Sequence, residues 1–265
     1  MKDKKQREAQ ALPRTHFDSS RLVRFLADLA IVDGPESKQT FALRMGQWVS
    51  FTDAVTLYTA LDSGTAQAAV KPSTVPAEAK SAAYLVARDE LTRVRTVLMD
   101  SIKRSCSPAL GAARIKFPIP ASDTPSEIAI TYSPFHRFYQ ALQREMDAKV
   151  PPLRATVREA LVAASPALSQ LAALDAALDA ILGDRERRLF GVVPVLLEKR
   201  FAQLLNGHQQ TLVSAGQTDD RAAWMRPGAW LASFRDELRE ALLAELDVRL
   251  QPVVGLIETF SNEVI

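Results

Sequence analysis

Apolar residues recur every three or four positions through most of the N-terminal half, and this period predicts amphipathic helices. The first predicted helix begins after Phe17, with Asp18 or a following serine as its cap, and stops at Asp33-Gly34-Pro35. The second begins near Glu36, and the third covers about 78–105, with a loop or linker over residues 62–80. The second helix is interrupted near Ser50, and its apolar positions are Phe41, Met45, Trp48, Val49, Val55, Leu57 and Leu61.

The C-terminal half shows the same helical period, and its signals for helix starts and ends are clearer. Two Ser-Pro pairs, Ser133-Pro134 and Ser165-Pro166, combine an N-cap residue with a proline at the first helical position, so each predicts a helix start. Residues 215–228 are polar and predict a loop, and the last helix begins near Pro227-Gly228. Helix ends or kinks are predicted at Pro151-Pro152, Pro194, Asn206-Gly207 and Pro252.

Between the two halves, the helical period disappears and prolines become frequent. Residues 127–131 could form one short strand, which would have no partner in the sequence. We therefore predict an all-α protein, a multi-helix bundle of long amphipathic helices in two units. Its predicted parts are a flexible basic tail (1–15), an N-terminal helical unit (16–105), an irregular proline-rich connector (106–132) and a C-terminal long-helix bundle (133–265).

The last predicted helix carries large apolar residues along a stripe that winds around it, because steps of four drift by about 40° per step. Such a stripe needs a cover, either within the chain or from another subunit. We expect the residues beyond Pro252 to pack against a second chain, either a copy of this chain or a companion subunit. The candidate partner interface is Trp230, Phe234, Ile257 and Phe260.

Composition narrows the class of protein further. Hydrophobic residues make up 47% and charged residues 24%, which is typical of a globular protein. Ten glycines against 15 prolines argue against an all-β fold and against glycine loops that hold phosphates. The net charge of +2 does not by itself demand nucleic acid or an anionic membrane. Because we find neither a signal-peptide pattern nor an apolar run of membrane-spanning length, we expect a cytoplasmic protein.

No set of residues combines a nucleophile, a base and a metal site. His16, His136 and His208 lack a second ligand at helical spacing, and the single Cys106 lacks a positioned base. Arg200 and His208 resemble the arginine and histidine of all-helical HEPN-type nucleases, but seven residues intervene instead of four to six. Glu78 and Lys80 match a fragment of metal-dependent nucleases without the strand it requires. We therefore expect no cofactor, no metal and no enzymatic activity.

The third predicted helix is the best candidate for contact with nucleic acid. Arg93 and Arg104 each have an aspartate four residues earlier, Asp89 and Asp100, which predicts ordinary pairing along the helix. Arg88 and Arg95 flank the apolar stripe without such an acid, so they are candidates for contact with a phosphate or a partner carboxylate. A solvated helix face remains the favoured interpretation, because the basic residues do not cluster on one stripe.

Four blocks of the sequence resemble a known protein family. They are residues 15–23 (THFDSSRLV), 45–54 (MGQWVSFTDA), 134–146 (PFHRFYQALQREM) and 189–201 (LFGVVPVLLEKRF). They are similar to an uncharacterised proteobacterial family encoded beside genes for a MotA-like membrane subunit and an OmpA-like peptidoglycan-binding subunit. That gene cluster resembles the type III Zorya anti-phage systems, which implies a ZorF-like accessory component. The resembling motifs are apolar, so the resemblance carries no active site.

The resulting expectation is a non-enzymatic cytoplasmic accessory protein that binds other proteins. The resemblance implies that it couples an ion-driven membrane motor to a response against phage, with companion proteins of the same gene cluster as partners and a homodimer as a further possibility. The first alternative is a nucleic-acid-binding effector that uses the N-terminal half. The second is a helical nuclease. Salt-dependent binding to DNA would favour the first alternative, and metal-dependent cleavage the second.

Overall fold

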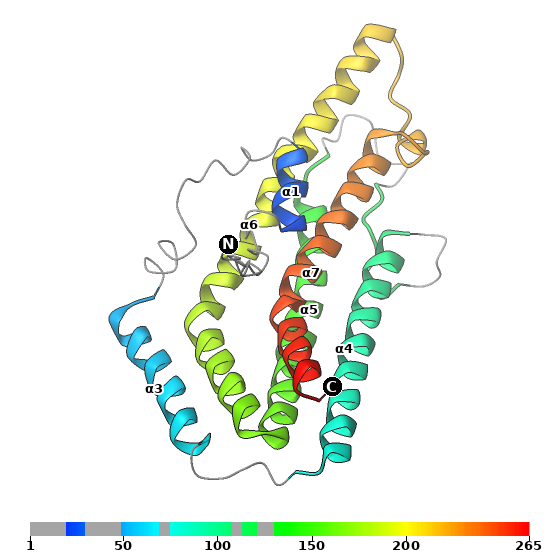
Figure 1. The fold of residues 1–265 in the computed structure, drawn as a ribbon. Coiled ribbons are helices and arrows are strands. Elements are labelled where there is room, and N and C mark those ends of the chain that lie inside the picture. The colour runs from blue at the N-terminus through cyan, green and yellow to red at the C-terminus, as the bar shows by residue number, and fades with distance from the viewer. Residues whose placement is uncertain (1–19, 30–48, 69–74, 108–112, 121–129, 265) are drawn as a thin grey trace, which may run out of the picture.

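The computed structural model describes residues 20–29, 49–68, 75–107, 113–120 and 130–264. These residues form helices and connecting turns, with no strand among them (Figure 1). The predicted all-α helical bundle is therefore confirmed for the described part of the chain. The helices are α1 (Arg21–Asp28), α3 (Phe51–Ala68), α4 (Ala77–Cys106), α5 (Ser133–Ala164), α6 (Pro166–Ala215), the 3-10 helix η3 (Arg221–Ala223) and α7 (Trp230–Val264).

Helix α7 lies at the centre of the molecule and contacts α1, α4, α5 and α6, while α3 packs on α6 (Figure 1). Its fully buried side chains include Phe234, Leu238, Leu242 and Phe260. Burial of one side chain of this size contributes roughly 1.5–3 kcal/mol. Helices α1 and α4, which precede the predicted connector, share one hydrophobic core with α5, α6 and α7. The connector therefore joins helices of one core and does not separate two cores.

Side-chain caps explain where three helices begin. The Ser20 Oγ accepts a 3.2 Å hydrogen bond from the Val23 N–H at the start of α1. Ser50 and Asp53 form a reciprocal cap: each side chain accepts a hydrogen bond from the other residue's N–H, at 3.2 and 2.8 Å. The Ser165 Oγ accepts from the Leu168 N–H at 3.2 Å, which confirms the predicted Ser-Pro start of α6.

Two predicted boundaries are wrong. Helix α3 continues to Ala68, so the first part of the predicted loop over 62–80 is helical, whereas α4 begins at Ala77, which agrees with the helix predicted over about 78–105. Helix α6 passes through Asn206-Gly207 and ends at Ala215. Gly216 takes the left-handed conformation there, with φ at 59°, and its N–H donates to the Val213 carbonyl. A glycine adopts this conformation at little steric cost, which is why the helix ends at this position.

Prolines lie inside three helices without ending any of them. Helix α5 runs through Pro151 and Pro152, so the predicted break there is wrong, and α6 and α7 run through Pro194 and Pro252. A proline inside a helix costs about 3 kcal/mol or more, partly because the carbonyl four residues earlier loses its donor. For Pro194 that carbonyl belongs to Phe190, and the Gln143 side chain supplies the missing donor at 3.0 Å. A tertiary contact thus replaces the lost helical hydrogen bond.

Several predictions fall wholly or partly outside the described residues. These are the 1–15 tail, the stop at residues 33–35, most of the stripe at Phe41, Met45 and Trp48, and most of the short strand at 127–131. In the described part of the predicted connector, residues 113–120 are irregular, and Phe117 is buried among aromatic side chains. Among the described helices, none is both long and apolar enough to cross a membrane.

Candidate functional site

A polar network is sealed inside the bundle where α5, α6 and α7 meet. The Glu245 side chain is fully buried and accepts hydrogen bonds from the Tyr139 hydroxyl at 2.8 Å and the Gln143 amide at 3.0 Å. The Arg249 guanidinium donates to the same carboxylate at 2.7 and 2.8 Å, and it lies over the Phe190 ring at 4.2 Å. We call these residues the buried Glu245 network.

Burial sets the electrostatics of this network. Loss of water raises the pKa of Glu245, and the adjacent Arg249 charge and the donated hydrogen bonds partly offset that rise. Burial, together with the neighbouring Glu245 carboxylate, also raises the pKa of Tyr139 well above its ordinary value. Because Glu245 has no exposed area, a substrate cannot reach its carboxylate in this conformation. The network therefore links three helices and offers no reaction site.

A second ionic cluster joins α5 to the start of α6. Arg154 and Arg158 each donate to both Asp175 and Asp179, with distances from 2.6 to 2.9 Å. Burial acts to raise the pKa of Asp175, but hydrogen bonds and charge from the two arginines outweigh it, so the pKa is lowered. The four charged side chains pair with one another, and these ion pairs stabilise the corner between α5 and α6.

The two residues of the HEPN-like pattern have separate partners. Arg200 pairs with Glu237 of α7 at 2.7 Å. The His208 ring lies 2.9 Å from the Asp219 carboxylate and stacks on the Trp230 ring, with 5.9 Å between ring centroids. Asp219 also accepts a 2.7 Å hydrogen bond from the Trp224 indole. These contacts give each residue a structural role at a different place along α6.

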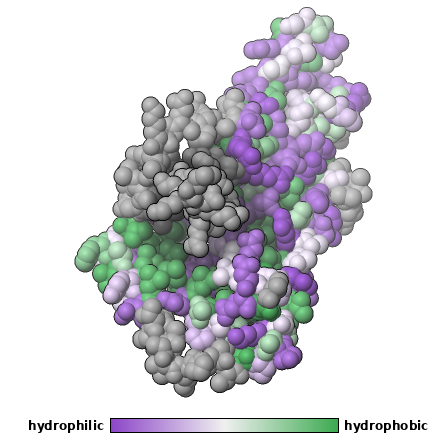
Figure 2. Space-filling view, viewed as in Figure 1, coloured by the Kyte–Doolittle hydropathy of each residue, from purple (hydrophilic) through white to green (hydrophobic). Residues whose placement is uncertain are grey.

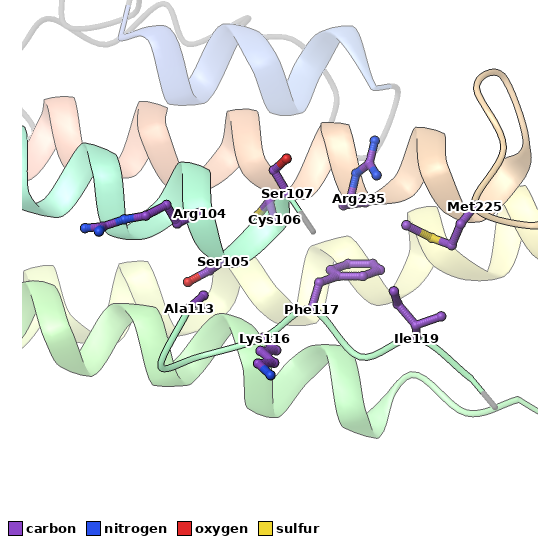
Figure 3. Close-up of a pocket in the computed structure, with 10 residues that line it drawn as sticks. All are labelled: Arg104, Ser105, Cys106, Ser107, Ala113, Lys116, Phe117, Ile119, Met225 and Arg235. Atoms are coloured by element: carbon purple, nitrogen blue, oxygen red, sulfur yellow. The ribbon is translucent and has the colours of Figure 1, made fainter. Parts of the chain in front are cut away.

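The cysteine lies in a small cavity at the C-terminal end of α4 (Figure 3). The cavity has a volume of about 200 Å³, and Phe117 and Met225 are among its apolar lining residues. Figure 3 shows the Arg104 side chain extending away from Cys106. Burial raises the pKa of Cys106 to about 12, so the thiol stays protonated at neutral pH and is a poor nucleophile. Within the described residues, no group of three His, Cys, Asp or Glu side chains could hold a metal ion.

The predicted partner interface on α7 lies in the core of this one chain. Trp230, Phe234, Ile257 and Phe260 are all buried. The Phe260 ring meets the Tyr84 ring of α4 edge-on, with 5.7 Å between centroids. The expectation that a second chain covers these side chains is therefore corrected: contacts within the chain, including those of α4, supply their cover.

Both candidate arginines of α4 have acidic partners. Arg88 pairs with its neighbour Asp89 at 3.0 Å, and Arg95 pairs with Asp247 of α7 at 3.2 Å. The predicted pairing along the helix is also different in detail. Arg93 pairs with Glu90 instead of Asp89, and the Arg104 Nε donates to the backbone carbonyl of Asp100. These partners leave α4 without the free cationic stripe that a phosphate backbone would need.

Helix α6 carries a second apolar face, which sequence reasoning missed. Leu189, Val192 and Val195 are 56%, 47% and 52% exposed, whereas Val193, between them in sequence, and Leu197, two positions after Val195, are buried in the core. The exposed cations Arg188 and Lys199 lie at the two ends of this row. We call these five residues, Arg188, Leu189, Val192, Val195 and Lys199, the α6 stripe. Their helical spacing was the available signal, but spacing alone does not tell which apolar face is covered.

Helix α3 adds exposed apolar side chains beside α6. Phe51 and Tyr58 are 86% and 67% exposed, and Val55 and Leu61 are also exposed. The Gln170 amide of α6 donates to the Leu61 carbonyl at 2.8 Å, which holds α3 against α6. Figure 2 shows apolar residues gathering where α3 lies against α6. Isolated exposed apolar residues are ordinary, but groups of this kind are typical of interaction surfaces.

Comparison with known proteins identifies a family but no function. No curated protein and no solved structure matches the chain. The family model described as "Protein of unknown function (DUF3348)" matches residues 8–262. This match covers nearly the whole chain and includes every helix except the last residues of α7. The chain therefore belongs to the DUF3348 family, for which the description states no function.

Proposed function

We propose that this protein is a non-enzymatic interaction protein that binds a partner protein through the α6 stripe and the adjacent exposed side of α3. The observation that carries the proposal is the row of exposed Leu189, Val192 and Val195 on a helix whose opposite face is fully packed. A folded chain gains stability when such side chains are covered, and here the bundle leaves them open to solvent. Binding of a partner would cover them.

The biological setting of this proposal comes from the sequence resemblance alone. A ZorF-like accessory component would act in the cytoplasm, beside a MotA-like membrane subunit and an OmpA-like subunit. We propose that one of these companion proteins contacts the α6 stripe and that the contact couples the ion-driven motor to the anti-phage response. The exposed face of a rigid helical bundle suits this role, because its side chains are positioned before the partner arrives.

Two observations make the rival functions less favoured. Arg88 and Arg95, the best candidates for contact with phosphate, already pair with carboxylates. Arg200 and His208, the best candidates for nuclease chemistry, are held by different acidic residues on α7 and in the loop before it. The accessible surface that remains most unusual is apolar, and an apolar surface favours a protein partner.

Site-specific photo-crosslinking tests the proposed function. A photoreactive amino acid is placed at Val192, and the chain is co-expressed with the MotA-like and OmpA-like subunits of its gene cluster. We expect a covalent adduct with one of these subunits. The matched control carries the same group at Arg137, an exposed residue of α5. Equal adducts at both positions, or none at Val192, would contradict the proposal.

A further inference from the structure

We infer that the α6 stripe receives an acidic amphipathic helix of the partner protein. This inference rests on the proposed function and specifies the chemistry of the partner. It follows from three features of α6: the charges at the ends of the stripe, the apolar residues between them, and the helix that already packs on the same face of α6.

The charges of the stripe are all positive. Arg188 and Lys199 are exposed, and no ion pair is seen for either among the described residues. Glu186 and Glu198 are six residues from Val192 on either side, which places each about 120° from Val192 around the helix and about 60° from the nearest apolar residue of the stripe. Asp184 lies at the edge of the face, but it pairs with Arg187. Among the described residues, the α6 stripe therefore presents two cations that form no ion pair with a carboxylate.

The apolar residues decide what kind of anion fits. Eleven positions separate Arg188 from Lys199, a rise of about 16 Å, or three helical turns. Leu189, Val192 and Val195 fill the interval, so the cations mark the ends of an apolar row. A nucleic-acid backbone presents closely and evenly spaced phosphates and would leave this row uncovered. A helix with an apolar stripe and acidic residues about three turns apart matches both the charges and the apolar row.

The same face of α6 already accepts a helix nearer its N-terminus. Gln170, which holds α3, is twenty-two positions before Val192 and therefore lies within about 40° of it around the helix. Leu174, Leu178 and Ile181 lie on this face between the two positions and are half-buried. The stripe thus continues a face on which a helix packs. An incoming helix would extend the row of contacts that α3 begins.

Synthetic peptides provide the test. One probe is a fluorescent amphipathic helical peptide with an apolar stripe flanked by glutamates, and the other has lysine in place of every glutamate. Fluorescence anisotropy measures the affinity of each peptide for the full chain. We expect the acidic peptide to bind more tightly than the basic one, and its affinity to fall as salt is added.

Charge reversal at the stripe should invert this preference. In the Arg188→Glu/Lys199→Glu variant, we expect roughly a tenfold loss of affinity for the acidic peptide and a gain for the basic one, because repulsion replaces attraction. The matched control is Arg137→Glu/Arg144→Glu, which reverses two exposed arginines on α5 and should change neither affinity. Circular dichroism confirms that both variants keep their helical content.

Four results would overturn the inference. The first is equal binding of the two peptides, and the second is binding of neither. The third is a dimer in light scattering that dissociates on charge reversal, because the occupant would then be a second copy of this chain. The fourth is binding to vesicles with anionic lipids but not to the acidic peptide, which would indicate a membrane surface.

Failure of the inference is distinguishable from failure of the proposed function. If Val192→Glu/Val195→Glu abolishes capture of the companion subunit while the peptides show no charge preference, only the acidic-helix inference fails. If that variant captures the companion as well as the wild type does, the proposed function fails as well.

Discussion

The buried Glu245 network and the α6 stripe show two opposite treatments of charged and apolar groups in one bundle. Inside, the Glu245 carboxylate meets donors from Tyr139, Gln143 and Arg249. Outside, Arg188 and Lys199 flank apolar side chains that nothing in the described chain covers. Buried charges are costly unless they are paired, so the inner network must be complete for the fold to be stable. The α6 stripe is exposed and needs no such pairing for the fold to be stable. Its residues can therefore be of the kinds that contact a partner.

This comparison predicts that changes to the inner network affect stability most strongly. Glu245→Ala would leave the Tyr139 hydroxyl without its acceptor and the nearly buried Arg249 guanidinium with Asp147 as its remaining carboxylate partner. We expect a loss of about 3–5 kcal/mol in the free energy of unfolding, measured by urea denaturation. Glu240→Ala is the control on the same helix, because its partner Arg21 is exposed and the pair should contribute less than about 1 kcal/mol. Equal effects of the two changes would contradict the structural role of the network.

Two phenylalanines compare the core with the surface directly. Phe260→Ala should cost about 3–5 kcal/mol in unfolding free energy, because the side chain is fully buried against Tyr84. Phe51→Ala should change it by less than about 0.5 kcal/mol, because Phe51 is almost entirely exposed. Thermal denaturation followed by circular dichroism measures both. A Phe260 variant as stable as the wild type would restore the idea that this residue serves an interface.

The ionic cluster between α5 and α6 predicts a pH dependence. The pKa of Asp175 is lowered in the folded state, so the stability it contributes is present above its unfolded pKa of 3.8 and is lost as the pH falls through the lowered value. Asp175→Asn should therefore cost about 1.5–3 kcal/mol at neutral pH. The gap between variant and wild type should shrink below about pH 4. A gap that stays constant into strong acid would show that charge is not its source.

The smallest effect is expected at the cysteine. Because the pKa of Cys106 is raised to about 12, the native thiol should not react with a thiol reagent at pH 8 on the timescale of an exposed cysteine. The reaction should become complete after denaturation in urea. A fast reaction of the folded protein would show that the cavity at the end of α4 opens readily.

The helices could be predicted well from the sequence, because the apolar period and the helix caps depend on residues that are close together in the chain. Ser165-Pro166 is an example, since the Ser165 cap bonds a residue three positions later. Helix breaks were predicted poorly where a distant residue changes the outcome. Pro194 interrupts no helix because Gln143, far away in sequence, supplies the donor that Phe190 lacks. Such a contact has no local signal.

The same limit explains the misplaced interface. The period of α7 identified Ile257 and Phe260 as residues that need a cover, and both are buried. The sequence could not show that Tyr84 of α4 helps to provide that cover. Helix α6 is apolar on two faces, and only the packed structure shows that Val193 is inside while Val192 is outside. Which face is left over for a partner is a property of the whole bundle.

A closed core and an open binding face on α6 are tested together by measuring stability and binding in one variant, Val192→Glu/Val195→Glu. We expect an unfolding free energy within about 0.5 kcal/mol of the wild type, because both side chains are exposed. We also expect that the variant no longer captures the companion subunit that crosslinks at Val192. A variant that loses several kcal/mol, or one that is stable and still captures the companion, would contradict the separation of a closed core from an open binding face.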